Sequence, residues 1–181
     1  MNEQAIDEYP RLKARTLRFT CGAPRSAQAI GDGTRALFLR SDGPEDTVTS
    51  LWMSWFDDAG QHHETLIADP RVLLGSNADS ENVPAEERAR RERAREGGSG
   101  IVSYSVDETG SRVVFTLNGR LFLAELGNVC SADSADNAGD GKASVRELCA
   151  GRLSVEAGTA PVLNPRISPD GEHVLYTTGE R

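Results

Sequence analysis

A run of arginine and glutamate residues between Pro84 and Arg95 holds the densest cluster of charged side chains in this sequence. The run contains five arginines and three glutamates, so guanidinium groups outnumber the carboxylates that could pair with them. A guanidinium presents its donors as a planar fork, which suits a carboxylate or a peptide carbonyl oxygen. The surplus arginines are therefore candidates for contact with a ligand.

The local signals around this run predict a short helix over 84–95. Pro84 stands at the first helical position, and Glu86 and Glu87 follow in the first turn. Gly97 and Gly98 mark the end of the helix. The uncharged positions after the proline are all alanines, which are too small and too few to anchor a helix in a core. The sequence thus predicts a helix that is present for its charge.

Two interpretations of this helix remain open. In the first, it is a solvated surface helix in which Glu86 pairs with Arg90 and Glu87 with Arg91, each pair adding about 0.2–0.5 kcal/mol. In the second, it presents an arginine to a carboxylate or carbonyl of a ligand. Composition does not choose between them.

The chain shows no motif for catalysis or metal binding. The nucleophile-elbow pattern Gly-x-Ser-x-Gly is missing, because Ile101 stands where the last glycine is required after Ser99. His62 and His63 are neighbours in an expected strand, so they point to opposite faces and cannot share one metal ion. No cysteine or carboxylate cluster stands beside them at ligand spacing. We expect no catalytic residue, no metal and no cofactor in this chain.

Composition bounds the class of protein. The chain has 181 residues, 38% of them apolar and 27% charged, which lies in the ordinary globular range. Its net charge of −8 argues against nucleic-acid binding, which needs a basic face. The acidic N-terminus is not a secretory signal, and no stretch reaches the ~18 apolar residues of a membrane span. The three cysteines, Cys21, Cys130 and Cys149, form no Cys-x-x-Cys pair. Free thiols are expected, and with them a cytoplasmic location.

Three segments repeat one pattern, a turn that ends in glycine followed by a β-rich run. They cover 30–39, 106–115 and 168–176. In the first unit we expect strands at 34–40, 49–56 and 61–67, with a turn at 57–60. In the second, strands at 112–117 and 120–126 flank Asn118-Gly119, the strongest short-range hairpin signal.

Such repeated antiparallel units predict an all-β fold, a partial β-propeller. We expect about two and a half blades of four antiparallel strands, with one short charged helix inserted. The expected segments are an N-terminal segment 1–26, a blade 27–75, the arginine-rich helix insertion 76–99, a blade 100–151 with an acidic loop 131–142, and the start of a further blade 152–181. The chain would then be truncated, because a propeller needs at least four blades.

Several of these segments resemble a known family. The arginine run, followed by Gly100-Ile-Val-Ser-Tyr104 and Asn118-Gly-Arg-Leu-Phe-Leu123, resembles the N-terminal propeller region of the dipeptidyl peptidase IV group of serine peptidases, in the prolyl oligopeptidase family. Two further segments fit this group, Arg18-Phe-Thr-Cys-Gly-Ala-Pro-Arg25 and Ile167-Ser-Pro-Asp-Gly171. The similarity spans nearly the whole chain in the expected order. It is greatest to the branch with cytosolic dipeptidyl peptidases and many bacterial homologues.

The resemblance implies a propeller followed by an α/β-hydrolase domain with a Ser-Asp-His triad, a domain that this chain lacks. It implies an exopeptidase that releases N-terminal dipeptides with Pro or Ala in second position. The propeller would gate and position the peptide substrate, and the complete enzyme would be a homodimer. The alternative is a non-enzymatic β-propeller binding module or fragment. The chain alone is expected to be inactive.

The resemblance also assigns a substrate contact to one arginine. In this branch the last arginine of the helix reaches the central cavity and contacts a carbonyl of the bound peptide. Counting back from Gly100, the matching residue is Arg95. Arg93 and Arg91 are the alternative assignments if the register shifts.

Overall fold

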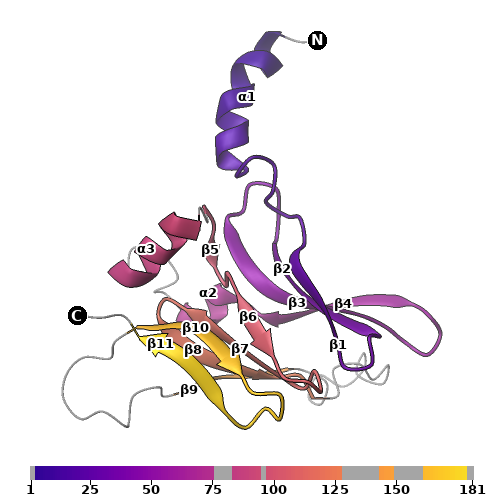
Figure 1. The fold of residues 1–181 in the computed structure, drawn as a ribbon. Helices are drawn as coiled ribbons and strands as arrows, with labels where there is room; N and C mark the ends of the chain where they lie inside the picture. The colour runs from indigo at the N-terminus through magenta and orange to yellow at the C-terminus, as the bar shows by residue number, and fades with distance from the viewer. Residues whose placement is uncertain (1–2, 76–82, 95–96, 128–142, 149–160, 179–181) are drawn as a thin grey trace.

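The computed structural model describes residues 3–75, 83–94, 97–127, 143–148 and 161–178, which form three sheets and three helices (Figure 1). All strand pairs are antiparallel except that of β3 (Val48–Phe56) with the short strand β5 (Ser99–Gly100). The first sheet contains β1 (Arg25–Ile30), β2 (Arg35–Ser41), β3 (Val48–Phe56) and β4 (His62–Ala68). The second contains β6 (Tyr104–Val106), β7 (Arg112–Leu117), β8 (Arg120–Glu125) and β9 (Ser144–Leu148). The third is the hairpin of β10 (Val162–Ile167) and β11 (Val174–Thr178). The helices are α1 (Glu3–Arg15), α2 (Pro70–Leu74) and α3 (Ala85–Ala94).

The first sheet is an antiparallel meander in the order β1-β2-β3-β4. The turn between β3 and β4 follows from Asp57, whose Oδ1 accepts hydrogen bonds from the amides of Ala59 and Gln61. Gly60 supplies the positive φ, 76°, that this turn needs. A short strand, β5 (Ser99–Gly100), pairs in parallel with the start of β3. The strands expected at 34–40, 49–56 and 61–67 appear as β2, β3 and β4, each shifted by about one residue.

The second sheet is a meander in the order β6-β7-β8-β9. Asn118 and Gly119 join β7 to β8 with φ of 51° and 75°. Positive φ at both central residues is the mark of a type I′ turn, the one that matches the twist of the flanking strands. The hairpin predicted from Asn118-Gly119 is therefore confirmed.

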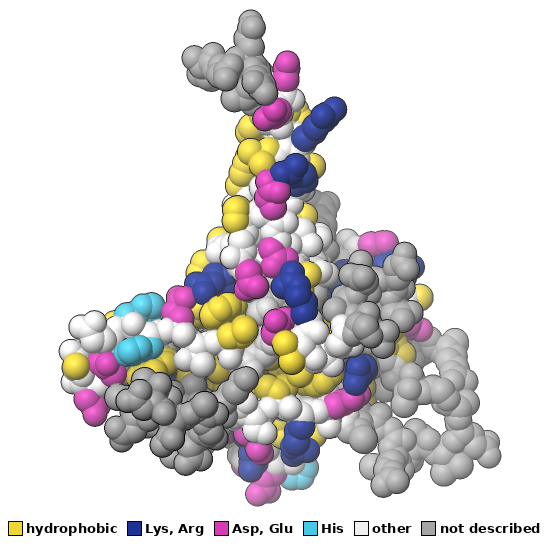
Figure 2. Space-filling model, turned by 180° about the vertical axis from the view of Figure 1, so that it is seen from behind, with side chains coloured by type: hydrophobic (Ala, Val, Ile, Leu, Met, Phe, Trp, Pro, Cys, Tyr) yellow, Lys and Arg dark blue, Asp and Glu magenta, His cyan; other side chains and the backbone are white. Residues whose placement is uncertain are grey.

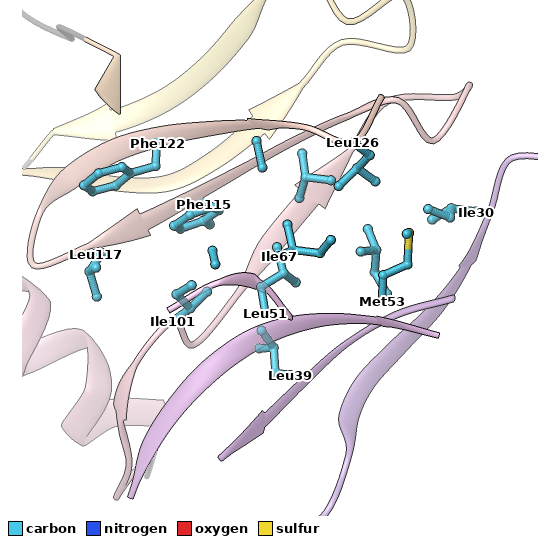
Figure 3. Close-up of a cluster of buried hydrophobic side chains, with 14 of the residues drawn as sticks. Ile30, Leu39, Leu51, Met53, Ile67, Ile101, Phe115, Leu117, Phe122 and Leu126 are labelled. Atoms are coloured by element: carbon cyan, nitrogen blue, oxygen red, sulfur yellow. The ribbon is translucent and has the colours of Figure 1, made fainter. Parts of the chain in front are cut away.

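The three sheets stack face to face, with the second sheet in the middle. Residues of alternate parity on β7 point to opposite sides. Val113, Phe115 and Leu117 pack against the first sheet, in a cluster that includes Leu39, Leu51 and Met53 (Figure 3). Val114 joins Leu121 and Leu123 against Val162 and Ile167 of the third sheet. Burial on both faces explains why β7 is a continuous apolar run and not an alternating one.

The glycine turns of the three repeats contact one another. A Cβ at Gly110 would lie 2.8 Å from Gly31 N and 3.0 Å from Ile30 Cβ. The amide of Glu108 donates to Pro169 O at 3.0 Å. The turn of each repeat therefore lies against that of the next. The recurring glycines, Gly33, Gly110 and Gly171, share a positive φ of 91°, 69° and 72°, which favours glycine at this place in each unit.

The contact between the first two turns predicts a difference between two glycine replacements. Gly110→Ala and Gly60→Ala both put a methyl group on a residue with positive φ, 69° and 76°. Both variants therefore lose stability through backbone strain. Only at Gly110 does the methyl also meet the neighbouring turn, because nothing lies within 4 Å at Gly60. We expect Gly110→Ala to lower the free energy of unfolding by about 1–3 kcal/mol more than Gly60→Ala. Urea denaturation of both variants measures the difference, and equal losses would contradict the contact.

The fold is mostly β with antiparallel sheets, as predicted, but it contains more than one helix. Only the charged helix was expected, whereas α1 and α2 are also present. The first sheet also begins earlier than expected, because β1 starts at Arg25. The acidic loop expected at 131–142 lies outside the described residues. The stacked sheets are open, and the number of blades stays a prediction.

Candidate functional site

The arginine-rich helix α3 spans Ala85–Ala94 and lies beside β5 (Figure 1). Pro84 immediately precedes it, and Pro84 O accepts the hydrogen bond of the Arg88 amide at 2.9 Å. Pro84 also packs at the β7–β8 turn, since a Cβ on Gly119 would lie 3.0 Å from Pro84 Cγ. The start of α3 is therefore fixed on the second sheet.

A buried ion pair anchors α3 in place of an apolar face. Glu87 is only 2% exposed and Arg91 only 9%. Glu87 accepts hydrogen bonds from Arg91 Nε at 2.9 Å and from Arg90 Nε and Nη2 at 2.8 and 2.9 Å. Burial raises the pKa of Glu87, but the two guanidinium groups outweigh it, so the pKa lies below its ordinary value. The predicted Glu87–Arg91 pair is present, and the structure buries it, which a fully solvated helix would not do.

Arg91 is held between the first two sheets. It lines a small cavity with Pro70 and Leu74 of α2, with Val48, and with Leu117 at the end of β7. Its guanidinium is committed to Glu87, so Arg91 is a support of the helix and is not placed to meet a ligand. The buried role of Glu87 and Arg91 was not predicted from the sequence, because it depends on neighbours far along the chain.

The remaining assigned arginines lie at the end of the helix. Arg93 is exposed in the last turn of α3. Arg95 lies outside the described residues. Of the three arginines named from the sequence, the structure therefore places Arg93 at the surface and Arg91 in the anchor.

The chain that leaves α3 is fixed against the first sheet. The amides of Ser99 and Ile101 donate to the carbonyl oxygens of Thr47 and Thr49, each at 2.9 Å. At Gly100, where φ is 82°, a Cβ would lie 2.5 Å from Thr49 O, so this close approach requires glycine. Glu87 thus holds α3, and the chain from Ser99 to Ile101 is held by the first sheet.

Acidic and basic side chains alternate on the surface below α1 (Figure 2). Arg71 Nη2 donates to Asp46 Oδ1 at 2.8 Å, and Arg15 pairs with Glu45. Asp69 caps α2 by accepting the amide of Arg71 at 2.8 Å. These ion pairs join α1 and α2 to the β2–β3 loop.

A groove of about 460 Å³ lies where the three sheets meet. Its walls are the end of β1, the end of β6 and the end of β10, through Ile30, Val106 and Ile167. Nearby, Tyr104 Oη lies 2.6 Å from Ser26 O and 2.9 Å from Leu37 O, so its single O–H is shared between carbonyl oxygens of β1 and β2. The first strand of each sheet therefore faces a common space.

The histidines of β4 behave as sequence alternation predicts. His62 Nε2 contacts Ser54 Oγ at 2.8 Å, whereas His63 Nε2 contacts Asp57 Oδ2 at 2.9 Å and its ring stacks on Trp55. The two imidazoles lie on opposite faces of the sheet. The Ser54–His62 contact has no carboxylate on the imidazole among the described residues, so it is a cross-strand hydrogen bond and not a catalytic triad.

One group of possible metal ligands was not foreseen. Asp170, Glu172 and His173 place ligand atoms within 4.8 Å of one another in the β10–β11 turn, and all three are exposed. Asp170 Oδ1 already accepts hydrogen bonds from Ser168 Oγ and the Glu172 amide. Its geometry is that of a turn stabilised by its own side chains.

Two general findings complete the description. Among the helices that the structure describes, none combines the length and apolar character needed to span a bilayer. Cys21 is a free thiol, while Cys130 and Cys149 lie outside the described ranges. In the comparisons with known proteins, no family model matches the chain and no curated protein matches it.

Proposed function

We propose that this chain forms consecutive blades at the N-terminal side of a β-propeller that belongs to a serine exopeptidase. The observation that supports the propeller is the stacking of the sheets. Each described sheet packs by its face on the next, and β1, β6 and β10, the first strands of their sheets, line one groove. Radial stacking of antiparallel meanders around a shared axis produces this arrangement.

The outer faces of the stack support the same proposal. Phe56 and Leu66 are 59% and 37% exposed on the face of the first sheet that points away from the second. Leu175 is 76% exposed on β11, opposite the residues that contact the second sheet. Apolar side chains on both outer faces suit further sheets packed against them.

Within this propeller, α3 positions the substrate. The Glu87–Arg91 ion pair holds α3 in place, and β5 holds the chain from Ser99 onward against β3. Arg95, or Arg93 in the alternative register, donates to a carbonyl of a peptide whose N-terminal dipeptide is released. The bond is broken by a hydrolase domain that residues 1–181 lack, and the complete cytoplasmic enzyme is a homodimer.

The test is an assay of the gene product that contains this chain on an Ala-Pro chromogenic amide. Arg95→Ala is expected to lower kcat/KM by a factor that corresponds to about 1.5–3 kcal/mol of lost transition-state stabilisation. This is the contribution of a hydrogen bond from a charged donor. Arg88→Ala is the control and is expected to change kcat/KM little, because Arg88 lies near the start of α3 and donates to Val83 O. Residues 1–181 alone are expected to show no turnover.

Three results would contradict the proposal. Equal losses of kcat/KM in Arg95→Ala and Arg88→Ala would contradict the contact assigned to Arg95. A loss of kcat/KM in Arg93→Ala alone would instead assign the contact to Arg93, the alternative register. Turnover by residues 1–181 that a serine-directed inhibitor abolishes would place the chemistry in this chain. A gene product that releases no dipeptide in any form would favour the non-enzymatic binding module.

A further inference from the structure

A second cavity, of about 330 Å³, lies between the loop after α1 and the first sheet. Its lining includes Leu17, Cys21, Arg25, Arg40, Asp46 and Gly98. The volume lies at the lower end of the range for small-molecule sites. Neither the arginine-rich helix nor the proposed peptidase role uses this cavity.

One wall of the cavity is an unusual turn. Leu17, Arg18 and Phe19 have φ of 47°, 66° and 65°, three successive left-handed residues without a glycine. Thr16, which is buried, holds the turn, since its carbonyl accepts the Thr20 amide at 3.0 Å and its Oγ1 accepts the Phe19 amide at 3.0 Å. Strained backbone of this kind persists where the surroundings fix it and is concentrated at ligand-binding sites. The wall is therefore preformed.

Arg25 supplies a positive charge to the cavity lining. Its Nη2 donates to Thr49 Oγ1 at 2.8 Å, and Thr49 is buried. Of the residues that the structure describes, no carboxylate pairs with Arg25. A guanidinium has five N–H donors, so most of this fork remains for a ligand while Thr49 fixes its orientation.

The other charged groups of the lining are already paired. Arg40 pairs with Glu64 at 2.8 Å and its guanidinium lies over the Trp52 ring at 4.5 Å from the centroid. Asp46 accepts from Arg71 at 2.8 Å and from the Val48 amide at 2.9 Å. Asp46 keeps its negative charge beside the cavity and disfavours a dianion such as phosphate. The ligand group that best fits these charges is therefore a single carboxylate.

We propose that this cavity binds a small molecule through one carboxylate, forked on the Arg25 guanidinium, with its remaining atoms against Leu17 and the left-handed turn. Two sources carry this chemistry, a free organic acid and the C-terminal carboxylate of a short peptide.

Cys21 provides a reporter inside the cavity. The full chain with Cys130→Ser and Cys149→Ser keeps Cys21 as its one thiol, and the rate of its modification by an aromatic disulfide measures access to the cavity. The probes are butyrate, the tripeptide Gly-Ala-Ala, and the C-terminal amide of that tripeptide. Butyrate or Gly-Ala-Ala is expected to slow modification saturably, and the better of the two identifies the source, whereas the amide is expected to leave the rate unchanged.

Substitution of Arg25 tests the assigned contact. The ratio of rates with and without probe corrects for any change in the thiol itself. Arg25→Ala is expected to weaken protection about tenfold or more, Arg25→Lys to weaken it less, and Arg166→Ala, an exposed arginine on β10, to leave it intact. Protection by the amide equal to that by the acid, protection that survives both Arg25 variants, or no protection by either carboxylate would overturn the proposal.

Discussion

Replacing Glu87 by alanine is expected to lower the free energy of unfolding by about 3–5 kcal/mol. Glu87 is 2% exposed and is the carboxylate partner of Arg91, which is 9% exposed. Its removal leaves a buried guanidinium without a counter-charge, and that is the costly way to break a buried ion pair. Glu92→Ala, on the exposed side of the same helix, is the control and is expected to stay within about 0.5 kcal/mol of the parent.

One further variant separates the ion pair from simple loss of packing. A double variant, Glu87→Met with Arg91→Met, is expected to recover most of the stability, because it removes both members of the buried pair and keeps apolar volume, and because Arg90, which also contacts Glu87, is more exposed than Arg91. Urea denaturation of the four proteins measures these differences. A loss from Glu87→Ala no larger than that from Glu92→Ala would mean that α3 is a solvated helix.

The same pair predicts a pH dependence. The pKa of Glu87 is lowered in the folded state, so its contribution to stability is present above the unfolded pKa of about 4.3 and is lost as pH falls through the folded pKa. The stability difference between the parent and Glu87→Ala should therefore be constant near neutral pH and shrink below about pH 4. A difference that keeps its size at low pH would contradict this assignment.

Phe115→Ala is expected to cost about 3–5 kcal/mol, comparable in size to the loss of Glu87. Phe115 is fully buried between the first two sheets, and its ring stacks on Phe122 with centroids 5.6 Å apart. The truncation opens a cavity in the layer that joins the sheets. Val72→Ala is the control, since Val72 is 77% exposed on α2 and should change stability by less than about 0.5 kcal/mol.

Thermal or urea unfolding of the two variants measures the contrast. Because Phe115 packs between the first two sheets, its substitution also tests whether these sheets share a core. A small loss at Phe115 would mean that the first two sheets do not share a core, and the face-to-face stack would be wrong.

Strands β2, β3, β4, β7 and β8 of the first two sheets could be predicted because their signals are local. Asn118-Gly119 sets a type I′ hairpin by its own backbone preference, and the Asp57–Gly60 turn fixes the β3–β4 pairing in the same way. The run from Arg112 to Leu117 carries the β-branched and aromatic residues of a buried strand. These features depend on few neighbours beyond the hairpin itself.

Elements without such signals were missed. β1 has a single buried residue, Ile30, and a sequence with little β preference, so its strand form depends on pairing with β2. α1 contains Pro10, which argues against a helix when the sequence is considered alone. In both, long-range context decides the structure.

The candidate site was predicted in part for the same reason. The spacing of Glu87 and Arg91 predicts their pairing, but spacing does not tell which face of a charged helix is buried. That face is set by Pro70, Leu74 and Leu117, which come from two other elements. The cavity beside Arg25 depends likewise on the left-handed turn at residues 17–19. This turn could not be predicted, because leucine, arginine and phenylalanine do not favour left-handed backbone.

An experimental structure of the gene product that contains this chain tests the central claim most directly. The propeller account predicts a further sheet packed on Phe56 and Leu66 at the outer face of the first sheet. It also predicts that β10 and β11 belong to a sheet of four antiparallel strands, and that β1, β6 and β10 are the innermost strands around one axis. A closed two-sheet sandwich, with β10 and β11 joined to the edge of the second sheet and the outer face of the first sheet in solvent, would contradict it.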